Sequence, residues 1–309
     1  MILTLTINPA IDRNVIADRL VFEDRGYILA TSESAGGRGI NASRVIHSFG
    51  GETLAISTTG ARTGKQFAEM LSGCGFPLEL VKIKNEIRTN LTITDKEGLS
   101  VKLNERGPAI DQAELDRIEK TVNGKLAGAQ WIMLCGSLPP GVPADFYSRL
   151  IRLAKKHGVK TLLDTDGDAL RDGIETGPTA VAPNQQEAER LLSRALITGS
   201  HFHEAAQRIK AMGAESVMLS LGSRGAVGVE GAGLFEAAPP RVDAVCPIGA
   251  GDAMAAAFVW AMAGGHGFED SVRWAVAAGT ASAVLPGLEF ASLEQTRRMY
   301  ARVLVRRVL

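Results

Sequence analysis

The stretch WIMLCGSLPPGVPADFYSRLIRLAKKHGVKTLL, residues 131–163, decides the fold. It begins with the continuous apolar run 131–135, which is typical of a strand buried on both faces of a sheet, and it ends with 159–163, which we predict to be a second buried strand. Residues 144–157, between these runs, have the spacing of an amphipathic helix. A strand, a helix and a second strand in this order predict a βαβ unit with two parallel strands.

The same alternation of strands and helices continues on both sides of this unit. The sequence predicts further strands at 2–7, 53–57, 78–83, 180–182 and 216–221. It predicts helices at 41–49, 64–71, 111–126, 168–175, from 185 onward, 203–212, 252–263, 268–283 and 293–305. Together these elements indicate an α/β fold with a parallel sheet that helices cover on both faces.

Two segments, 13–32 and 87–103, interrupt this pattern because their apolar and polar residues alternate with period two. The second segment carries two such runs on either side of the turn DKEG, residues 95–98, which predicts a β-hairpin. We therefore expect a small β-structure, from about 13–35 and 86–106, that projects from the body. It would cover a site or pair with a second subunit, and a surface hairpin without a role is the alternative.

The composition excludes several classes of protein. The 309 residues include 34 Lys and Arg and 34 Asp and Glu, so the net charge is zero and no basic field attracts nucleic acid or an anionic membrane. No apolar stretch approaches the roughly 18 residues of a transmembrane helix, and we expect no signal peptide. Cys74, Cys135 and Cys246 are widely spaced and odd in number, which argues against a disulfide framework or a zinc site and favours the cytoplasm.

The stretch IGAGDAM, residues 248–254, indicates the chemistry most clearly. A glycine-rich turn that opens a helix directs free backbone N–H groups toward an anion. A carboxylate at Asp252 could orient a hydroxyl and accept its proton during attack on a phosphoryl group, for which an ordinary Asp pKa suffices. The alternative is that Asp252 only caps the helix.

Other polar turns follow other predicted strands, and such turns meet at one edge of a parallel sheet, where ligands bind. Asp12, in NPAID, could accept hydrogen bonds from sugar hydroxyls or simply form a turn. In PNQQE, Asn184 and Glu187 have the spacing of a capping box, or they could hold Mg²⁺ through water. The stretches 37–42 and 60–66 lack the context or the residues that a dinucleotide fold or a P-loop requires.

In this order, the motifs NPAID, GGRGINAS, GSLPPG, PNQQE, SLGSRGA and GAGD resemble those of the ribokinase-like sugar kinases of the phosphofructokinase B family. The resemblance covers essentially the whole chain, 1–309, as a single kinase domain. It implies a doubly wound α/β body with a β-sheet lid. It also implies transfer of the γ-phosphoryl group of ATP to a sugar hydroxyl, with Mg²⁺.

The resemblance further implies roles for individual residues. It makes Asp252 the base, beside an anion hole formed by Gly249, Ala250 and Gly251. The residues implied in sugar binding are Asp12, Gly37, Asn41 and Ser137. Those implied in the nucleotide site are Asn184, Ser220, Gly222 and Gly225, with Glu187 in the Mg²⁺–phosphate network.

The NPAID and GSLPPG motifs are similar to those of the hexose-phosphate branch: 1-phosphofructokinases, tagatose-6-phosphate kinases and the minor 6-phosphofructokinases. A substrate that already carries a phosphate needs cations, for which Arg38 and Arg88 are placed. Arg25 resembles a lid residue that in some relatives reaches the neighbour's substrate, so a homodimer through the lid is expected. The segment KLNERGP, 102–108, favours fructose 1-phosphate as the acceptor, with fructose 6-phosphate and tagatose 6-phosphate as alternatives.

The chain departs from the branch at several positions, one of which is Cys135 in place of a common Ser. Arg38 stands where Lys is common, Ala182 stands where Lys commonly precedes Pro-Asn, and Cys246-Pro247 replaces the usual Ser/Asp-Thr. Two further functions therefore stay open. One is a kinase of the same fold that acts on an unphosphorylated sugar or a nucleoside, and the other is a non-catalytic sugar-phosphate binding or regulatory protein.

Overall fold

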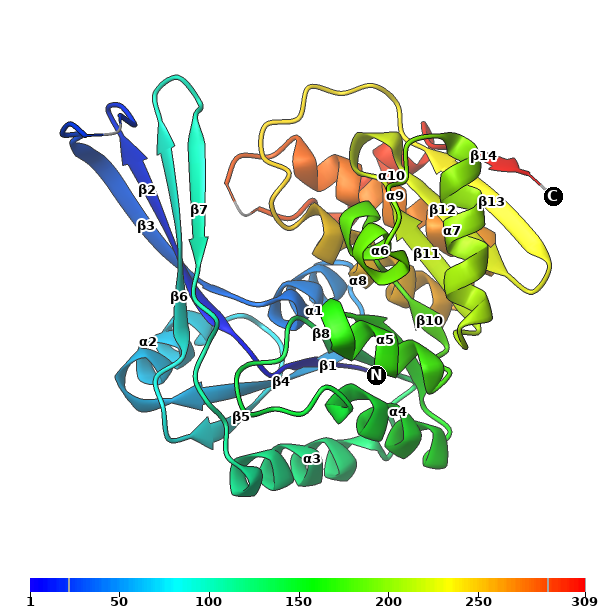
Figure 1. The fold of residues 1–309 in the computed structure, drawn as a ribbon, viewed down its shortest axis with the longest axis horizontal. Coiled ribbons are helices and arrows are strands. Elements are labelled where there is room, and N and C mark those ends of the chain that lie inside the picture. Colours follow the sequence, from blue (N-terminus) through cyan, green and yellow to red (C-terminus); the bar gives the residue numbers. More distant parts are fainter. Residues whose placement is uncertain (22, 288, 309) are drawn as a thin grey trace.

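The computed structural model describes residues 1–21, 23–287 and 289–308. Phe22, which falls in the predicted lid range, lies outside them. The protein consists of an α/β body built on a 10-stranded sheet and a lid formed by a separate 4-stranded sheet (Figure 1). No helix of the described residues is long and apolar enough to cross a membrane.

The main sheet is mostly parallel. Its strand order is β14-β13-β12-β11-β10-β9-β8-β1-β4-β5, and the strands from β5 to β11 in this order are parallel, while β12, β13 and β14 are antiparallel. The strands are β1 (Ile2–Thr6), β4 (Thr53–Gly60), β5 (Leu78–Ile83), β8 (Trp131–Cys135), β9 (Lys160–Asp164), β10 (Ala180–Val181), β11 (Ser216–Ser220), β12 (Ala226–Glu230), β13 (Gly233–Ala238) and β14 (Leu304–Arg307).

Helices cover both faces of this sheet, as predicted. One face carries α1 (Arg38–Ser48), α8 (Ala250–Ala263), α9 (Phe268–Ala283) and α10 (Leu293–Tyr300). The other carries α2 (Ala61–Leu71), α3 (Gln112–Leu126), α4 (Phe146–Lys156), α5 (Gly167–Glu175), α6 (Gln185–Leu192) and α7 (Gly199–Ala211). Alternate side chains of β1 enter the two cores: Leu3 and Leu5 belong to one core and Ile2 belongs to the other.

The lid is the sheet β3-β2-β6-β7, made of β2 (Ala10–Ala17), β3 (Ile28–Gly36), β6 (Arg88–Asp95) and β7 (Ser100–Asn104). It extends away from the body (Figure 1). The predicted hairpin joins β6 to β7, and the Asp95 carboxylate closes its turn by accepting hydrogen bonds from the N–H groups of Glu97 and Leu99 at 3.0 and 2.9 Å.

The C-terminal prediction was wrong in part. The helix expected over 293–305 ends at Tyr300, and Leu304–Arg307 instead forms β14, which pairs with β13 at the edge of the sheet. The apolar residues 303–305 fit either element locally, and pairing with β13, a strand that was itself not predicted, decides between them.

Candidate active site

Polar residues gather at the carboxyl edge of the parallel strands. They end or follow β1, β8, β9, β10 and β11, and they are Asn8, Ser137, Asp164, Asn184 and Ser220. An isolated bridge between Asn184 and Ser220 places two of these turns side by side. The edge is therefore where a ligand would meet side chains from several loops.

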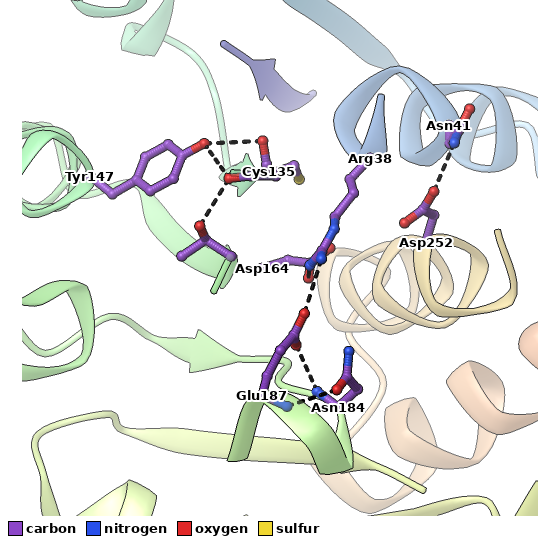
Figure 2. A network of polar contacts seen from close by, with 10 residues as sticks. Arg38, Asn41, Cys135, Tyr147, Asp164, Asn184, Glu187 and Asp252 are labelled. Carbon is purple, nitrogen blue, oxygen red and sulfur yellow. Dashed lines mark hydrogen bonds and ion pairs between the residues drawn. The ribbon is translucent and has the colours of Figure 1, made fainter. Parts of the chain in front are cut away.

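Asp252 lies in the first turn of α8 at this edge. The N-cap residue is Gly249, whose φ of 80° is in the left-handed region that favours glycine, and no side chain caps the helix. The Asp252 carboxylate instead accepts a hydrogen bond from Asn41 Nδ2 at 2.7 Å (Figure 2). Asp252 is therefore not the helix cap, and its carboxylate is held by α1.

The environment of Asp252 disfavours its charged form. Burial, with the nearby charge of Asp164, raises the pKa of Asp252 from 3.8 to about 7, against the opposing effects of the Asn41 hydrogen bond and Arg38. An ordinary Asp pKa was expected, and the structure differs because the carboxylate is desolvated. A carboxylate with this pKa can both accept and release a proton near neutral pH.

The backbone beside Asp252 has free donors. The N–H of Ala250 donates to the carbonyl of Pro247 at 3.2 Å. Over residues 1–21, 23–287 and 289–308, the N–H groups of Gly251 and Asp252 have no acceptor, and Gly251 faces open space. These two amides, at the positive end of the α8 dipole, are suited to bind an anion.

Asp12 forms a second polar centre where the lid joins the body. Its Oδ1 accepts a hydrogen bond from Asn90 Nδ2 at 2.8 Å, because Asp12 and Asn90 are partners in the parallel β2–β6 pair. Gly36 lies against the other oxygen so closely that a Cβ would be 1.9 Å from Oδ2. Burial raises the pKa of Asp12, and the Asn90 hydrogen bond and the charges of Arg88 and Arg44 oppose this effect.

Unpartnered polar atoms surround these two carboxylates. Buried polar atoms are normally hydrogen-bonded. Among the described residues, those without a partner include Asn8 Oδ1, Ser34 Oγ, Asn41 Oδ1, Arg88 Nε and Asn90 Oδ1, and the others are on Arg149, Arg273 and Thr296. The first group combines acceptors, a hydroxyl and a donor around Asp12 and Asp252, which fits a ligand with several hydroxyl groups.

Arg38 binds two carboxylates. Its Nη1 donates to Asp164 Oδ1 at 2.6 Å and its Nη2 to Glu187 Oε1 at 2.9 Å (Figure 2). These contacts hold the pKa of Arg38 well above its usual value, chiefly through Asp164. The guanidinium of Arg38 thus lies between β9 and α6, and the expected contact of Arg38 with a sugar phosphate stays a prediction.

The other expected substrate residues lie in different environments. Arg88 donates to the carbonyls of Asn8 and Glu105 at 3.0 and 3.1 Å, which leaves its Nε free. Ser137 accepts a hydrogen bond from Asn8 Nδ2 at 3.3 Å. Arg25 is exposed in the connection between β2 and β3 at the far end of the lid, and the structure does not bring it to the other site residues of its own chain.

The expected nucleotide residues form turns at the carboxyl edge. Gly222 and Gly225 have φ angles of 60° and 91°, and they bracket the turn between β11 and β12. Gly225 lies so close to Ala237 that a Cβ would be 1.9 Å from its carbonyl oxygen, whereas Gly222 faces open space. Gly225 therefore shapes the turn, and the open position belongs to Gly222 beside Ser220.

Asn184 and Glu187 form the capping box of α6. Asn184 Oδ1 accepts the Glu187 N–H and Glu187 Oε2 accepts the Asn184 N–H, both at 2.9 Å. Because Arg38 binds Oε1, both carboxylate oxygens of Glu187 have a protein partner. Among the described residues, no group of three or more His, Cys, Asp or Glu side chains could hold a metal ion. The residues present therefore do not fit direct ligation of Mg²⁺ by Glu187, and the expected role of Glu187 through water stays a prediction.

Sequence reasoning missed Asn90, Ser34 and Asp164. Asn90 follows Arg88 with period two, so the alternation of the lid strand placed both on one face and could have identified it. Asp164 directly follows a predicted buried strand, the same signal that identified Asp12. Ser34 gave no comparable signal, because its position depends on the pairing of β3 with β2.

Comparison with known proteins assigns the chain to a family. The model of the pfkB family of carbohydrate kinases matches residues 5–295. The chain belongs to this family. The pfkB chain is 33% identical to the ATP-dependent 6-phosphofructokinase isozyme 2 of Escherichia coli over 97% of its own length and 98% of that protein. It is 29% identical to the 1-phosphofructokinase of Borreliella burgdorferi over 99% and 98%.

The solved structures agree with this assignment. The structure of Escherichia coli phosphofructokinase-2 in complex with substrates and products superposes with a TM-score of 0.91, at 33% identity, over 97% of this chain and 98% of that one. The predicted fold class and the family resemblance are thus confirmed. This pfkB protein is a carbohydrate kinase, a phosphotransferase with an alcohol group as acceptor.

Proposed function

We propose that this pfkB kinase uses ATP to phosphorylate a ketohexose phosphate, and that fructose 1-phosphate, converted to fructose 1,6-bisphosphate, is the acceptor. The observation that carries this proposal is the buried Asp252 carboxylate, held by Asn41 beside two free amides of α8. A base and an anion site at one helix end match the needs of phosphoryl transfer.

These contacts support the following reaction. The sugar hydroxyl oxygen attacks the γ-phosphorus of ATP, the bond to the β-phosphate oxygen breaks, and ADP leaves. Asp252 accepts the hydroxyl proton, which leaves late because the transition state is loose. The amides of Gly251 and Asp252 offset the charge on the transferred group. Mg²⁺ bound with ATP would neutralise phosphate charge, and Glu187, whose two carboxylate oxygens have protein partners, would reach it through water.

The sugar end of the site favours an acceptor that already carries a phosphate. Asp12, Asn8 and Asn90 offer acceptors and donors for sugar hydroxyls, and Arg88 offers a cation with a free Nε. Arg–phosphate contacts are strong because the hydrogen bonds are charge-assisted. We choose fructose 1-phosphate because the segment 102–108 resembles that of the 1-phosphofructokinase and tagatose-6-phosphate kinase branch. Fructose 6-phosphate and tagatose 6-phosphate are the alternatives.

We also propose that two copies pair through the lid. Large apolar side chains that are exposed on the lid support this pairing, and they include Ile16, Ile28, Leu29, Leu99, Val101 and Leu103. Such a dimer would cover them and would bring Arg25 of one copy toward the sugar phosphate of the other. The mass in solution tests this: Leu29→Asp with Leu103→Asp should turn a dimer into a monomer, and a wild-type monomer would contradict it.

The function is tested by ADP release from Mg·ATP with fructose 1-phosphate, fructose 6-phosphate or tagatose 6-phosphate, compared as kcat/KM. A preference for fructose 1-phosphate supports the proposal, and a preference for another of the three replaces the acceptor. Turnover of a neutral sugar alone would favour the kinase of an unphosphorylated acceptor. Binding of a hexose phosphate without ADP release would favour a non-catalytic protein. This alternative rests on Ala182, which stands where the branch commonly has Lys.

A further inference from the structure

The guanidinium of Arg38 lies between the end of β9 and the first turn of α6 in the candidate active site. Arg38 is the first residue of α1 and follows Gly37, yet its guanidinium reaches the last residue of β9, Asp164, and the first turn of α6, at Glu187 (Figure 2). The two contacts, at 2.6 and 2.9 Å, use different nitrogens, so the planar group bridges the two carboxylates. We call Arg38, Asp164 and Glu187 the carboxylate–arginine bridge.

The two carboxylates of the bridge are buried. The side chains of Asp164 and Glu187 are 8% and 2% exposed, whereas that of Arg38 is 31% exposed. A buried carboxylate without a counter-charge is costly, and two that face each other are more costly. A cation between them offsets this cost, and Arg38 supplies it from a third element.

Two buried carboxylates, one at the end of β9 and one in the first turn of α6, are also oxygen donors of the kind that bind divalent cations in proteins. A guanidinium in the same place changes this chemistry, because it is always protonated and covalently attached. The guanidinium does not exchange with ions from solvent. It binds Oε1 of Glu187, and because the backbone N–H of Asn184 donates to Oε2, neither oxygen of Glu187 is without a partner.

We propose that Arg38 is the resident cation of this carboxylate pair and that the protein without nucleotide binds no divalent metal ion between Asp164 and Glu187. Any Mg²⁺ in the reaction then enters with the nucleotide. The inference concerns the site of the proposed kinase, but it holds whichever sugar is the acceptor, and its test uses neither ATP nor sugar.

The test is Mn²⁺ binding to the full-length protein without nucleotide, measured from the loss of the free Mn²⁺ signal in electron paramagnetic resonance. The wild type should leave the signal unchanged. Arg38→Met should create one site, bound at least about tenfold more tightly than by the wild type, because it frees two carboxylates. Arg38→Lys, which keeps a cation, should create none. Adding Glu187→Gln to Arg38→Met should abolish the new site.

Arg13→Met is the matched control, because Arg13 also pairs with a carboxylate, that of Glu33, but on the lid at 2.5 Å. It should create no Mn²⁺ site. A wild-type site that Glu187→Gln removes would overturn the proposal, and so would a folded Arg38→Met protein that binds no Mn²⁺. Circular dichroism establishes folding, and if Arg38→Met is unfolded, the comparison of the wild type with Glu187→Gln decides the question.

Discussion

Replacing Asp252 by asparagine should stabilise the protein, and the gain should grow with pH. The native structure buries the Asp252 carboxylate beside Asp164, which raises its pKa to about 7, whereas the unfolded chain has the ordinary value of 3.8. A group whose pKa is raised by folding makes its full contribution to the stability of the native state below its unfolded pKa. This contribution is lost as the pH rises through the folded pKa. The window is therefore pH 3.8 to about 7.

The size of the effect follows from the same two values. Above pH 7 the ionised carboxylate costs the native state up to about 4 kcal/mol relative to a neutral group, since one pKa unit corresponds to about 1.4 kcal/mol. At pH 5 the cost is about 1.5 kcal/mol. Asparagine has no charge to bury, and its amide could donate to Asn41 Oδ1, which has no partner. The advantage of Asp252→Asn should therefore increase by about 2 to 3 kcal/mol from pH 5 to pH 8.

Urea unfolding of the wild type and of Asp252→Asn at pH 5, 6.5 and 8 measures this difference. Asp243→Asn is the control, because Asp243 is an exposed aspartate in the connection before α8. Its effect should be small and the same at each pH. If Asp252→Asn is no more stable than the wild type at pH 8, or if its advantage does not change with pH, the carboxylate is not desolvated as the structure indicates, and the reasoning fails.

The remaining predictions concern activity. Asp252→Asn should lower kcat by about 10²- to 10⁴-fold with little change in KM, and unchanged turnover would contradict the role of Asp252 as the base. The kcat/KM of the wild type should rise with pH to a plateau, with its midpoint near pH 7, because the base must be ionised. Gly36→Ala should raise the KM for the sugar at least about tenfold but not that for ATP, because its Cβ would displace the Asp12 carboxylate, 1.9 Å away. Gly124→Ala, whose Cβ meets no atom within 4 Å, should leave both KM values unchanged. Arg88→Met should lower kcat/KM for a hexose phosphate about 10- to 100-fold, and an equal loss with a neutral sugar would contradict a phosphate contact.

The parallel strands in the middle of the sheet could be predicted from the sequence, because burial on both faces leaves a run of apolar residues such as 131–135, which forms β8 without a shift at either end. The antiparallel edge strands β12, β13 and β14 were not predicted. Helix starts were less predictable, because capping is decided by single residues. The helix expected from 203 begins at Gly199, where Thr198 accepts a hydrogen bond from the N–H of His201.

The candidate site could be predicted in outline because polar turns after parallel strands converge. Asp252 and Asn41, 211 residues apart, are in direct contact. The contacts of Arg38 could not be predicted in this way, because its position in a glycine loop does not indicate which carboxylates lie opposite. That depends on β9 and α6, which the sequence places more than 120 residues away.

The spacing of Arg38 and Asn41 links the two halves of the site. Residues three apart lie on the same side of a helix, so the first turn of α1 directs both side chains toward the carboxyl edge. Asn41 holds the Asp252 carboxylate, while Arg38 neutralises Asp164, the charge that contributes most, after burial, to the raised pKa of Asp252. The first turn of α1 therefore sets both the position of the Asp252 carboxylate and part of the electric field around it. Because Gly37 and Gly39 let this turn approach β1 to within contact of Thr6, the packing of α1 on β1 fixes the geometry of the Asp252 carboxylate.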